Sequence, residues 1–362
     1  DLSTHGRGGL GIDIENGFVP DYEISPGKQA IVSNLKAAIK KADEVYLATD
    51  PDREGEAISW HLADLLGLPV DKTKRLLFYE ITKPAITEAM KHPGLIDVNL
   101  VKAQETRRME DRIIGFKVSG LLQRFYGHQS AGRVQSSTLR MIVDRDRAIA
   151  AFTPEEYWTI AVEVNINGKK CLAKLTRVDG KPLKCRSKEE CDAILARLPK
   201  TLSVTSVNTT KKRISPKPPF KTSTLQQEAF SKLHFSNKQT QSIAQKLFEE
   251  FGLITYIRVD STRVSPEFYH RQAVPFIKEK YGDAYVGSMP VGKSRATDQG
   301  AHEAIRPTNA YRTPEEVAKM NIGTQAEKLY RLIYSRTMAS MMAPKLVEQT
   351  SVILSGGGLD FS

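Results

Sequence analysis

A short apolar run that passes directly into closely spaced carboxylates is the feature that most constrains how this chain can fold. Residues 45–49, VYLAT, are typical of a buried strand, and residues 50–54, DPDRE, carry acidic side chains at alternate positions before a helix with apolar spacing. A second strand-like run, RLLFYEI at 75–81, precedes another helix. Because strand and helix alternate in this order, we predict a parallel α/β sheet over residues 1–96.

The acidic residues of this turn could bind a metal ion. Asp50, Asp52 and Glu54 follow the first strand, at the edge where α/β sheets place their sites, and carboxylate oxygens suit Mg²⁺. The alternative is that these residues only favour the start of the helix, through its cap and its dipole. Carboxylates this close repel one another unless a cation or Arg53 compensates them, so we favour a magnesium site.

The predicted secondary structure changes twice in the remainder of the chain, from helical to β-rich and back to helical. Residues 101–122 and 136–150 have helical spacing, and β-rich runs occupy much of 157–210. A basic, proline-rich connector is expected at 210–222. We predict helices at 223–233, with a capping box from Ser223 to Gln226, and at 237–250, then a strand at 253–262; helix, turn, helix and strand in this order resemble a winged helix-turn-helix.

The charge balance indicates a polyanionic partner. Lysine and arginine number 53 against 42 acidic residues, which gives a net charge of +11. Nucleic acid is favoured over a membrane, because no long uncharged apolar run could span a bilayer. Cys171, Cys185 and Cys191 form no CxxC pair, so they fit neither a disulfide framework nor a zinc ribbon. With no signal-peptide pattern at the start of the chain, we expect a reducing cytoplasm.

Tyr256 and Arg258 lie two positions apart in LITYIRVDST, residues 253–262. In a strand their side chains would share one face with Ile254, so the phenol and the cation would be neighbours. A nearby positive charge favours phenolate and so activates a tyrosine as a nucleophile. The alternative is a half-buried edge strand whose tyrosine packs on the core under the arginine stem.

Other polar side chains in three segments are candidates for contact with a phosphodiester: Arg108 and Arg112, Arg133 and Gln135, and His302 and Arg306. The first pair lies one turn apart on a predicted helix, and the second lies in SAGRVQS, whose small residues allow close backbone approach. The third pair has i, i+4 spacing, which suits a phosphodiester in reaction. The alternatives are a solvated helix face paired with Glu105 or Asp111, and a structural histidine.

Taken together, these segments resemble the cleavage core of the type IA DNA topoisomerases, in that family's order and over nearly the whole chain. The acidic turn resembles the Toprim metal motif, and Tyr256 falls on the family's nucleophile. Ile257 follows Tyr256 where the topoisomerase III group usually has proline, which favours the bacterial topoisomerase I branch. The matching stretches are LATDPDREGEAISWHL, FYEITKPAI, RRMEDRIIGFKVS, SAGRVQSS, PFKTSTLQQEA, GLITYIRVDST and AHEAIRPT.

The resemblance implies an isomerase that relaxes negatively supercoiled DNA without ATP, by transient single-strand cleavage through a 5′-phosphotyrosine, strand passage and religation with Mg²⁺. No GxxxxGK[ST] motif for nucleotide binding occurs in the chain. Arg258 and His302 would assist Tyr256, and the three acidic residues would hold Mg²⁺. Contacts with the DNA backbone would come from Arg108, Arg112, Arg133, Gln135, Thr222, Ser223, Thr224, Gln226 and Arg306.

The family's architecture implies a multi-domain α+β and α/β fold in a toroidal arrangement. The expected domains are a Toprim α/β domain at 1–96, a helical domain at 97–152, a β-rich hinge or gate domain at 153–217 and 344–362, and a helix-turn-helix-like domain at 218–343 that carries the tyrosine. We expect a cytoplasmic, nucleoid-associated monomer that acts on single-stranded and negatively supercoiled DNA. The family's first strand, with a catalytic glutamate and a lysine, would precede Asp1, and further modules would follow Ser362.

Three rival hypotheses stay open at this stage. A topoisomerase III-like decatenase belongs to the same family and would use the same residues. A Toprim nuclease or primase would cleave or extend DNA with Mg²⁺ and form no covalent adduct. A non-enzymatic helix-turn-helix protein would bind a duplex and tolerate loss of the tyrosine hydroxyl.

Overall fold

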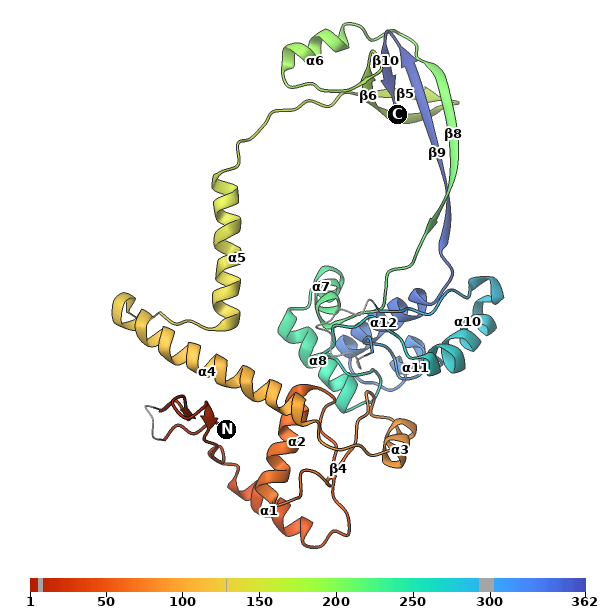
Figure 1. Cartoon of the computed structure of the whole chain (residues 1–362). Coiled ribbons are helices and arrows are strands. Elements are labelled where there is room, and N and C mark those ends of the chain that lie inside the picture. Colours follow the sequence, from red (N-terminus) through yellow and green to blue (C-terminus); the bar gives the residue numbers. More distant parts are fainter. Residues whose placement is uncertain (6–8, 128, 293–302) are drawn as a thin grey trace. The chain divides into compact units, whose positions relative to one another are not determined.

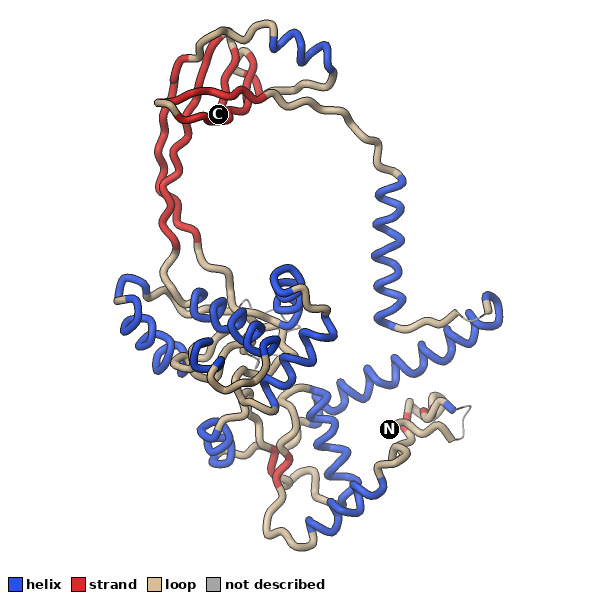
Figure 2. Tube along the Cα trace, turned by 180° about the vertical axis from the view of Figure 1, so that it is seen from behind, coloured by secondary structure: helices blue, strands red, loops and turns tan. Residues whose placement is uncertain are grey.

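The computed structural model describes residues 1–5, 9–127, 129–292 and 303–362. The chain forms two compact units, of which the first comprises Asp1–Arg140 and Pro216–Ala343. The second comprises Met141–Ser215 and Pro344–Ser362. Helices dominate the first unit, whereas most strand residues belong to the second (Figure 1, Figure 2).

The N-terminal part of the first unit alternates strands and helices. Its elements are β1 (Ile12–Asp13), β2 (Val19–Pro20), α1 (Gln29–Ile39), β3 (Tyr46–Leu47), α2 (Arg53–Leu66), β4 (Lys74–Arg75), α3 (Lys83–Lys91) and α4 (Val98–Tyr126). The parallel sheet predicted over 1–96 is confirmed only for β3 and β4, which lie parallel, because β1 and β2 form a separate antiparallel pair. The parallel pair is short. The Leu76 amide still donates to the Leu47 carbonyl at 2.9 Å, but the run 75–81 then leaves β3. Further along this run, the Tyr79 carbonyl accepts from the Tyr256 amide.

A buried ion pair joins these elements behind the acidic turn. Arg75 is fully buried and its Nε lies 3.0 Å from Glu56 Oε2 on α2. The same guanidinium donates to the carbonyls of Thr49 at 2.9 Å and Asp50 at 2.8 Å. Glu56 Oε1 accepts from the Asp97 amide, at the cap of α4, at 2.7 Å. One cation therefore holds the end of β3, the start of α2 and the start of α4 together.

The rest of the first unit contributes mainly helices. Its elements are α5 (Arg133–Ala150), which continues into the second unit, α7 (Thr222–Leu233), α8 (Asn237–Glu249), α9 (Pro266–Phe268), a π-helix (Tyr269–Ala273), α10 (Val274–Tyr281), a 3₁₀ turn (Asp283–Tyr285), α11 (Pro314–Ala318) and α12 (Thr324–Ser340). Helices α7, α8 and α12 pack together around Leu247, Leu329 and Ile333, which are fully buried. Helix α7 begins one residue earlier than predicted, and its cap joins Lys221 to Thr224 instead of Ser223 to Gln226.

The prediction of a strand at 253–262 is wrong. Residues 250–265 form a loop, here called the tyrosine loop, in which only Ile254 makes an isolated bridge, to Pro307. All five residues from Leu253 to Ile257 are buried, so side chains do not alternate between two faces. The backbone of the loop forms hydrogen bonds with separate segments, including Tyr79 and Arg306. It therefore does not form the regular ladder with one neighbouring strand that a sheet requires.

The second unit is built on an antiparallel sheet. Its strands and helix are β5 (Ala161–Ile166), β6 (Lys169–Val178), β7 (Lys181–Pro182), α6 (Lys188–Leu195), β8 (Ser203–Ile214), β9 (Lys345–Gly356) and β10 (Leu359–Phe361). The strand order is β5-β6-β10-β9-β8, with β7 beside β6. Strand β8 pairs with β9 as far as Ile214, so the start of the predicted connector at 210–222 is strand. Among the described residues, no helix has the length and apolar content needed to cross a membrane.

Replacing Arg75 tests the buried ion pair. Arg75→Met keeps the length of the side chain but leaves the Glu56 carboxylate buried without its cation, which typically costs about 3–5 kcal/mol. We expect thermal or denaturant unfolding to show a loss of this order. The adjacent Lys74→Met is the matched control, because Lys74 pairs with Glu44 at the surface, at 2.7 Å, and should change stability little. Equal losses for the two variants would contradict the role given to Arg75.

Candidate active site at the acidic turn

The acidic turn, residues 50–54, takes its shape from a helix cap and a glycine. Asp52 caps α2, and its Oδ1 accepts from the Gly55 amide at 2.7 Å. A Cβ on Gly55 would lie 2.0 Å from the Asp50 carbonyl oxygen, so a side chain cannot be accommodated there without moving the turn. The Asp50 carbonyl is in turn fixed by Arg75. The turn is therefore positioned by its backbone, which leaves the Asp50 carboxylate and one Asp52 oxygen for other partners.

The tyrosine loop places Tyr256 against this turn. The Tyr256 hydroxyl donates to Asp52 Oδ2 at 2.7 Å, and the Tyr256 amide donates to the Tyr79 carbonyl at 3.0 Å. Its ring packs edge-on against Phe248 of α8, with centroids 5.6 Å apart. Two motifs that are 204 positions apart in the sequence thus meet through the hydrogen bond between Tyr256 and Asp52.

This environment holds the phenol in its protonated form. Burial, then the hydrogen bond to Asp52 and the charges of Asp52 and Asp50 raise the pKa of Tyr256 well above its usual range. Partial desolvation, then the charge of Asp52, also raise the pKa of Asp50. Arg258 lowers the pKa of both groups and is exposed, so its positive charge acts on the phenol and the carboxylates alike. The predicted proximity of Tyr256 and Arg258 is present, although no strand produces it.

The three predicted metal ligands do not converge. The side chain of Glu54 is 47% exposed and accepts from Gln104 of α4 at 2.8 Å. Within the described ranges, no group of three or more histidine, cysteine or acidic side chains is arranged to hold a metal ion. Asp50 and Asp52 alone form an oxygen donor pair whose mutual repulsion a cation would relieve. Such a pair fits Mg²⁺, which keeps several waters and commonly binds one or two carboxylates together with phosphate oxygens.

The predicted DNA-contact residues of α4 and α5 lie near one another and are partly paired. Arg108 bonds to Asp1, and Arg112 donates to the Gly9 carbonyl at 2.9 Å; these partners differ from the intrahelical ones considered from the sequence. Arg133 pairs with Asp111 at 2.9 Å. A hollow of about 300 Å³ is lined by Leu2, Glu54, Gln104, Arg107, Arg108, Asp111 and Arg112. Arg107, which the sequence analysis did not select, belongs to this basic surface.

The predicted contact residues of α7 have two kinds of position. Thr222 Oγ1 donates to the Ile257 carbonyl at 2.7 Å and accepts from the Val259 amide at 2.9 Å, so it shapes the tyrosine loop around Arg258. Thr224 caps its own helix. Ser223 is exposed and Gln226 is half-buried. Thr222 therefore reaches the site through the backbone of the tyrosine loop.

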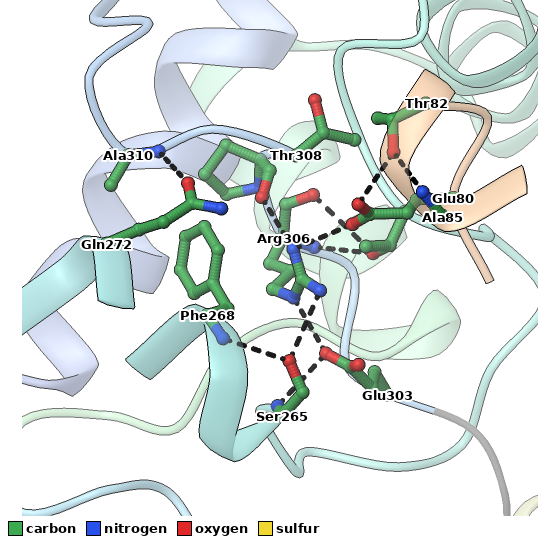
Figure 3. Close-up of polar contacts among 12 residues, drawn as sticks. Glu80, Thr82, Ala85, Ser265, Phe268, Gln272, Glu303, Arg306, Thr308 and Ala310 are labelled. Carbon is green, nitrogen blue, oxygen red and sulfur yellow. Dashed lines mark hydrogen bonds and ion pairs between the residues drawn. The ribbon is translucent and has the colours of Figure 1, made fainter. Parts of the chain in front are cut away.

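The remaining two predictions fall at 302 and 306. His302 lies outside the described residues. Arg306 is buried among Glu303, Glu80 and the ring of Phe268, as Figure 3 shows. Its guanidinium is already paired with two carboxylates, a placement that does not favour contact with DNA. The sequence analysis gave Glu80 no role, although it lies in the matching stretch FYEITKPAI.

Asp52→Asn tests the electrostatic coupling at the turn. Asparagine removes the negative charge that opposes phenolate, so the pKa of Tyr256 should fall, although burial still keeps it raised. Ultraviolet titration of phenolate would measure this shift as a difference spectrum against Tyr256→Phe in each background. Asp64→Asn, at an exposed position of the same helix, is the control. An unchanged Tyr256 titration in Asp52→Asn would exclude the coupling.

Comparisons with known proteins show the family to which the chain belongs. A family model described as DNA topoisomerase matches residues 95–362, and a Toprim domain model matches residues 7–81. The solved structure of full-length topoisomerase I from Thermotoga maritima is similar to the whole of this chain, with a TM-score of 0.84 and 40% sequence identity. The chain spans 59% of the length of that protein. This chain belongs to the bacterial, type IA family of DNA topoisomerases.

Proposed function

We propose that this chain carries the strand-cleavage and religation chemistry of an ATP-independent DNA topoisomerase, which relaxes negatively supercoiled DNA. The observation that supports this most directly is the hydrogen bond between the Tyr256 hydroxyl and Asp52 Oδ2. It places the proposed nucleophile, Tyr256, beside a pair of carboxylates of the kind that binds metal ions. A helix-turn-helix DNA-binding protein has no need of that meeting, and a Toprim nuclease or primase has no need of the tyrosine.

The side chains present can carry each proton and charge of the cleavage step. Asp52 Oδ2 is placed to take the phenol proton as the contact between the two groups opens, after which the Tyr256 oxygen attacks a backbone phosphorus of single-stranded DNA. The new tyrosine–phosphorus bond replaces the bond to the 3′ oxygen, which leaves as a hydroxyl with the proton that Asp52 returns directly or through water. Arg258 would stabilise the negative charge on the phenolate and on the phosphorus oxygens. Because one phosphodiester replaces another, resealing needs no ATP.

Asp50 and Asp52 would hold Mg²⁺ near the reacting phosphate. When bound there, the ion would neutralise phosphate charge and help to orient the 3′ end for religation. The Glu54 side chain accepts a hydrogen bond from Gln104, so binding of Mg²⁺ by Glu54 would require a rotation of this side chain. Arg108, Arg112, Arg133, Gln135, Ser223 and Gln226 would bind the DNA backbone, with Arg107 beside them, and His302 would assist Tyr256.

The finer architecture is part of the same proposal. The division at 1–96, 97–152, 153–217 with 344–362, and 218–343 is compatible with an antiparallel unit that the chain enters from α5, leaves after β8 and enters again at β9. A toroidal arrangement with a helix-turn-helix-like domain, without the wing strand expected at 253–262, and a monomeric state would suit strand passage. Action on chromosomal DNA would place the protein in the cytoplasm, at the nucleoid. A topoisomerase III-like decatenase activity is the second candidate, because it would use the same residues.

A covalent-adduct assay tests the proposal. The protein is mixed with single-stranded DNA that carries its label on the 3′ side of the break, denatured, and examined for protein-bound label. Tyr256→Phe should abolish the adduct, whereas Tyr285→Phe, at an exposed position, should not. Chelation of Mg²⁺ should slow resealing and so increase the adduct. Cleavage that persists in Tyr256→Phe, without protein-bound label, would favour a metal nuclease instead.

A further inference from the structure

Arg306 connects the tyrosine-bearing part of the first unit to the segment that follows β4. Its Nη1 lies 3.2 Å from Glu80 Oε2, and its Nε lies 2.7 Å from Glu303 Oε2. Glu303 lies three positions before Arg306, whereas Glu80 comes from the chain that leaves the acidic-turn elements. Of the two carboxylates, only that of Glu80 therefore links different parts of the unit.

Burial limits the groups that can compensate Arg306 and Glu80. The side chain of Arg306 is 5% exposed, and its guanidinium lies over the Phe268 ring with a separation of 4.3 Å. Glu80 Oε2 is buried and has no hydrogen-bond partner among the described residues, so the charge of Arg306 is its compensation there. The other oxygen, Oε1, accepts from Thr82 at the start of α3, at 3.0 Å. Figure 3 shows these groups converging on Arg306.

The contact lies directly beside the backbone of Tyr256. The Arg306 amide donates to Thr255 Oγ1 at 3.0 Å, and its carbonyl accepts from the Thr255 amide at 2.9 Å. On the other side, Tyr79, which precedes Glu80, accepts from the Tyr256 amide at 3.0 Å. The segment with Tyr79 and Glu80 is thus joined to the tyrosine-bearing part twice, through the Tyr256 backbone and through the Arg306 ion pair.

We propose that Arg306 is a positioning residue, which acts through Glu80 to clasp the tyrosine loop onto the acidic-turn elements and so keeps Tyr256 closed against Asp52. This inference rests on the proposed function and deepens it. The phenol is occupied by Asp52 in the closed arrangement, so a phosphate can reach it only when the two groups separate. The clasp borders an open cleft of about 1360 Å³, lined also by Thr82 and Arg312, so solvent reaches the edge of this contact.

Chemical accessibility of Tyr256 in the DNA-free protein tests the clasp. Glu80→Gln removes the charge but keeps an acceptor for Thr82. Loss of a charge-assisted buried contact should raise the population of the open arrangement, and with it the rate of Tyr256 nitration by tetranitromethane, about tenfold. Peptide mass spectrometry measures nitration residue by residue. Tyr330, fully buried in the core of the tyrosine-bearing part, is the internal reference and should stay protected.

Glu303→Gln is the matched control. It also removes a carboxylate from Arg306, but its own contacts, with Arg306 and the Ser265 amide, stay within one part of the unit. Its Tyr256 nitration should stay near that of the unaltered protein. The clasp is refuted by an unchanged Tyr256 rate in Glu80→Gln, by equal increases in Glu80→Gln and Glu303→Gln, or by parallel increases at Tyr330, which would show that Glu80 stabilises the whole fold.

The adduct assay separates failure of the clasp from failure of the proposed function. If Glu80→Gln exposes Tyr256 but the unaltered protein forms no adduct with DNA, the clasp stands and the cleavage chemistry fails. If the unaltered protein forms the adduct and Glu80→Gln leaves nitration unchanged, the chemistry stands and the clasp fails.

Discussion

The buried pairing of Arg75 with Glu56 is the interaction on which the rest of the site depends. A guanidinium without solvent access needs a carboxylate and several carbonyl acceptors, and Arg75 finds them on β3, on the acidic turn and at the start of α2. These elements are fixed relative to one another because each of them provides an acceptor to the Arg75 guanidinium. The carboxylates of the acidic turn are thereby held at the end of β3, with Gly55 permitting the close approach of the Asp50 carbonyl.

A second constraint follows from placing a phenol against that turn. The hydrogen bond between Tyr256 and Asp52 stabilises a closed, protonated tyrosine, which is unreactive until the two groups part. The proposed chemistry therefore needs a structure that holds the phenol in place and also releases it. Arg258 already supplies positive charge to the phenol from an exposed position, so a phosphate that enters the opened site would meet both the nucleophile and a cation. The same few contacts therefore control both the closed position of Tyr256 and its reactivity.

Arg306 shows why a motif does not settle the role of each of its residues. From the sequence it has the charge and spacing of a phosphate contact. In the structure it is buried against Phe268 between two carboxylates, and its backbone supports Thr255, next to the nucleophile. The exposed or half-buried candidates of α4 and α5 keep their proposed part in DNA binding, and Arg107 joins them. Burial and pairing, which no spacing rule contains, divide these arginines into two groups.

The sequence by itself determined most local elements and named the residues on which the proposed chemistry rests. Helical spacing and the strand-to-turn transition located α1 to α5, α7 and α8, and the pairing of β3 with β4, because these depend on residues close together in the chain. The motifs named Tyr256, Arg258, Asp50 and Asp52. Only the tertiary structure decided that residues 253–262 form a loop, because their backbone hydrogen bonds go to distant segments whose positions no local pattern encodes. The contacts of Tyr256 with Asp52, of Arg75 with Glu56 and of Arg306 with Glu80 were settled in the same way, since each joins groups that only packing brings together.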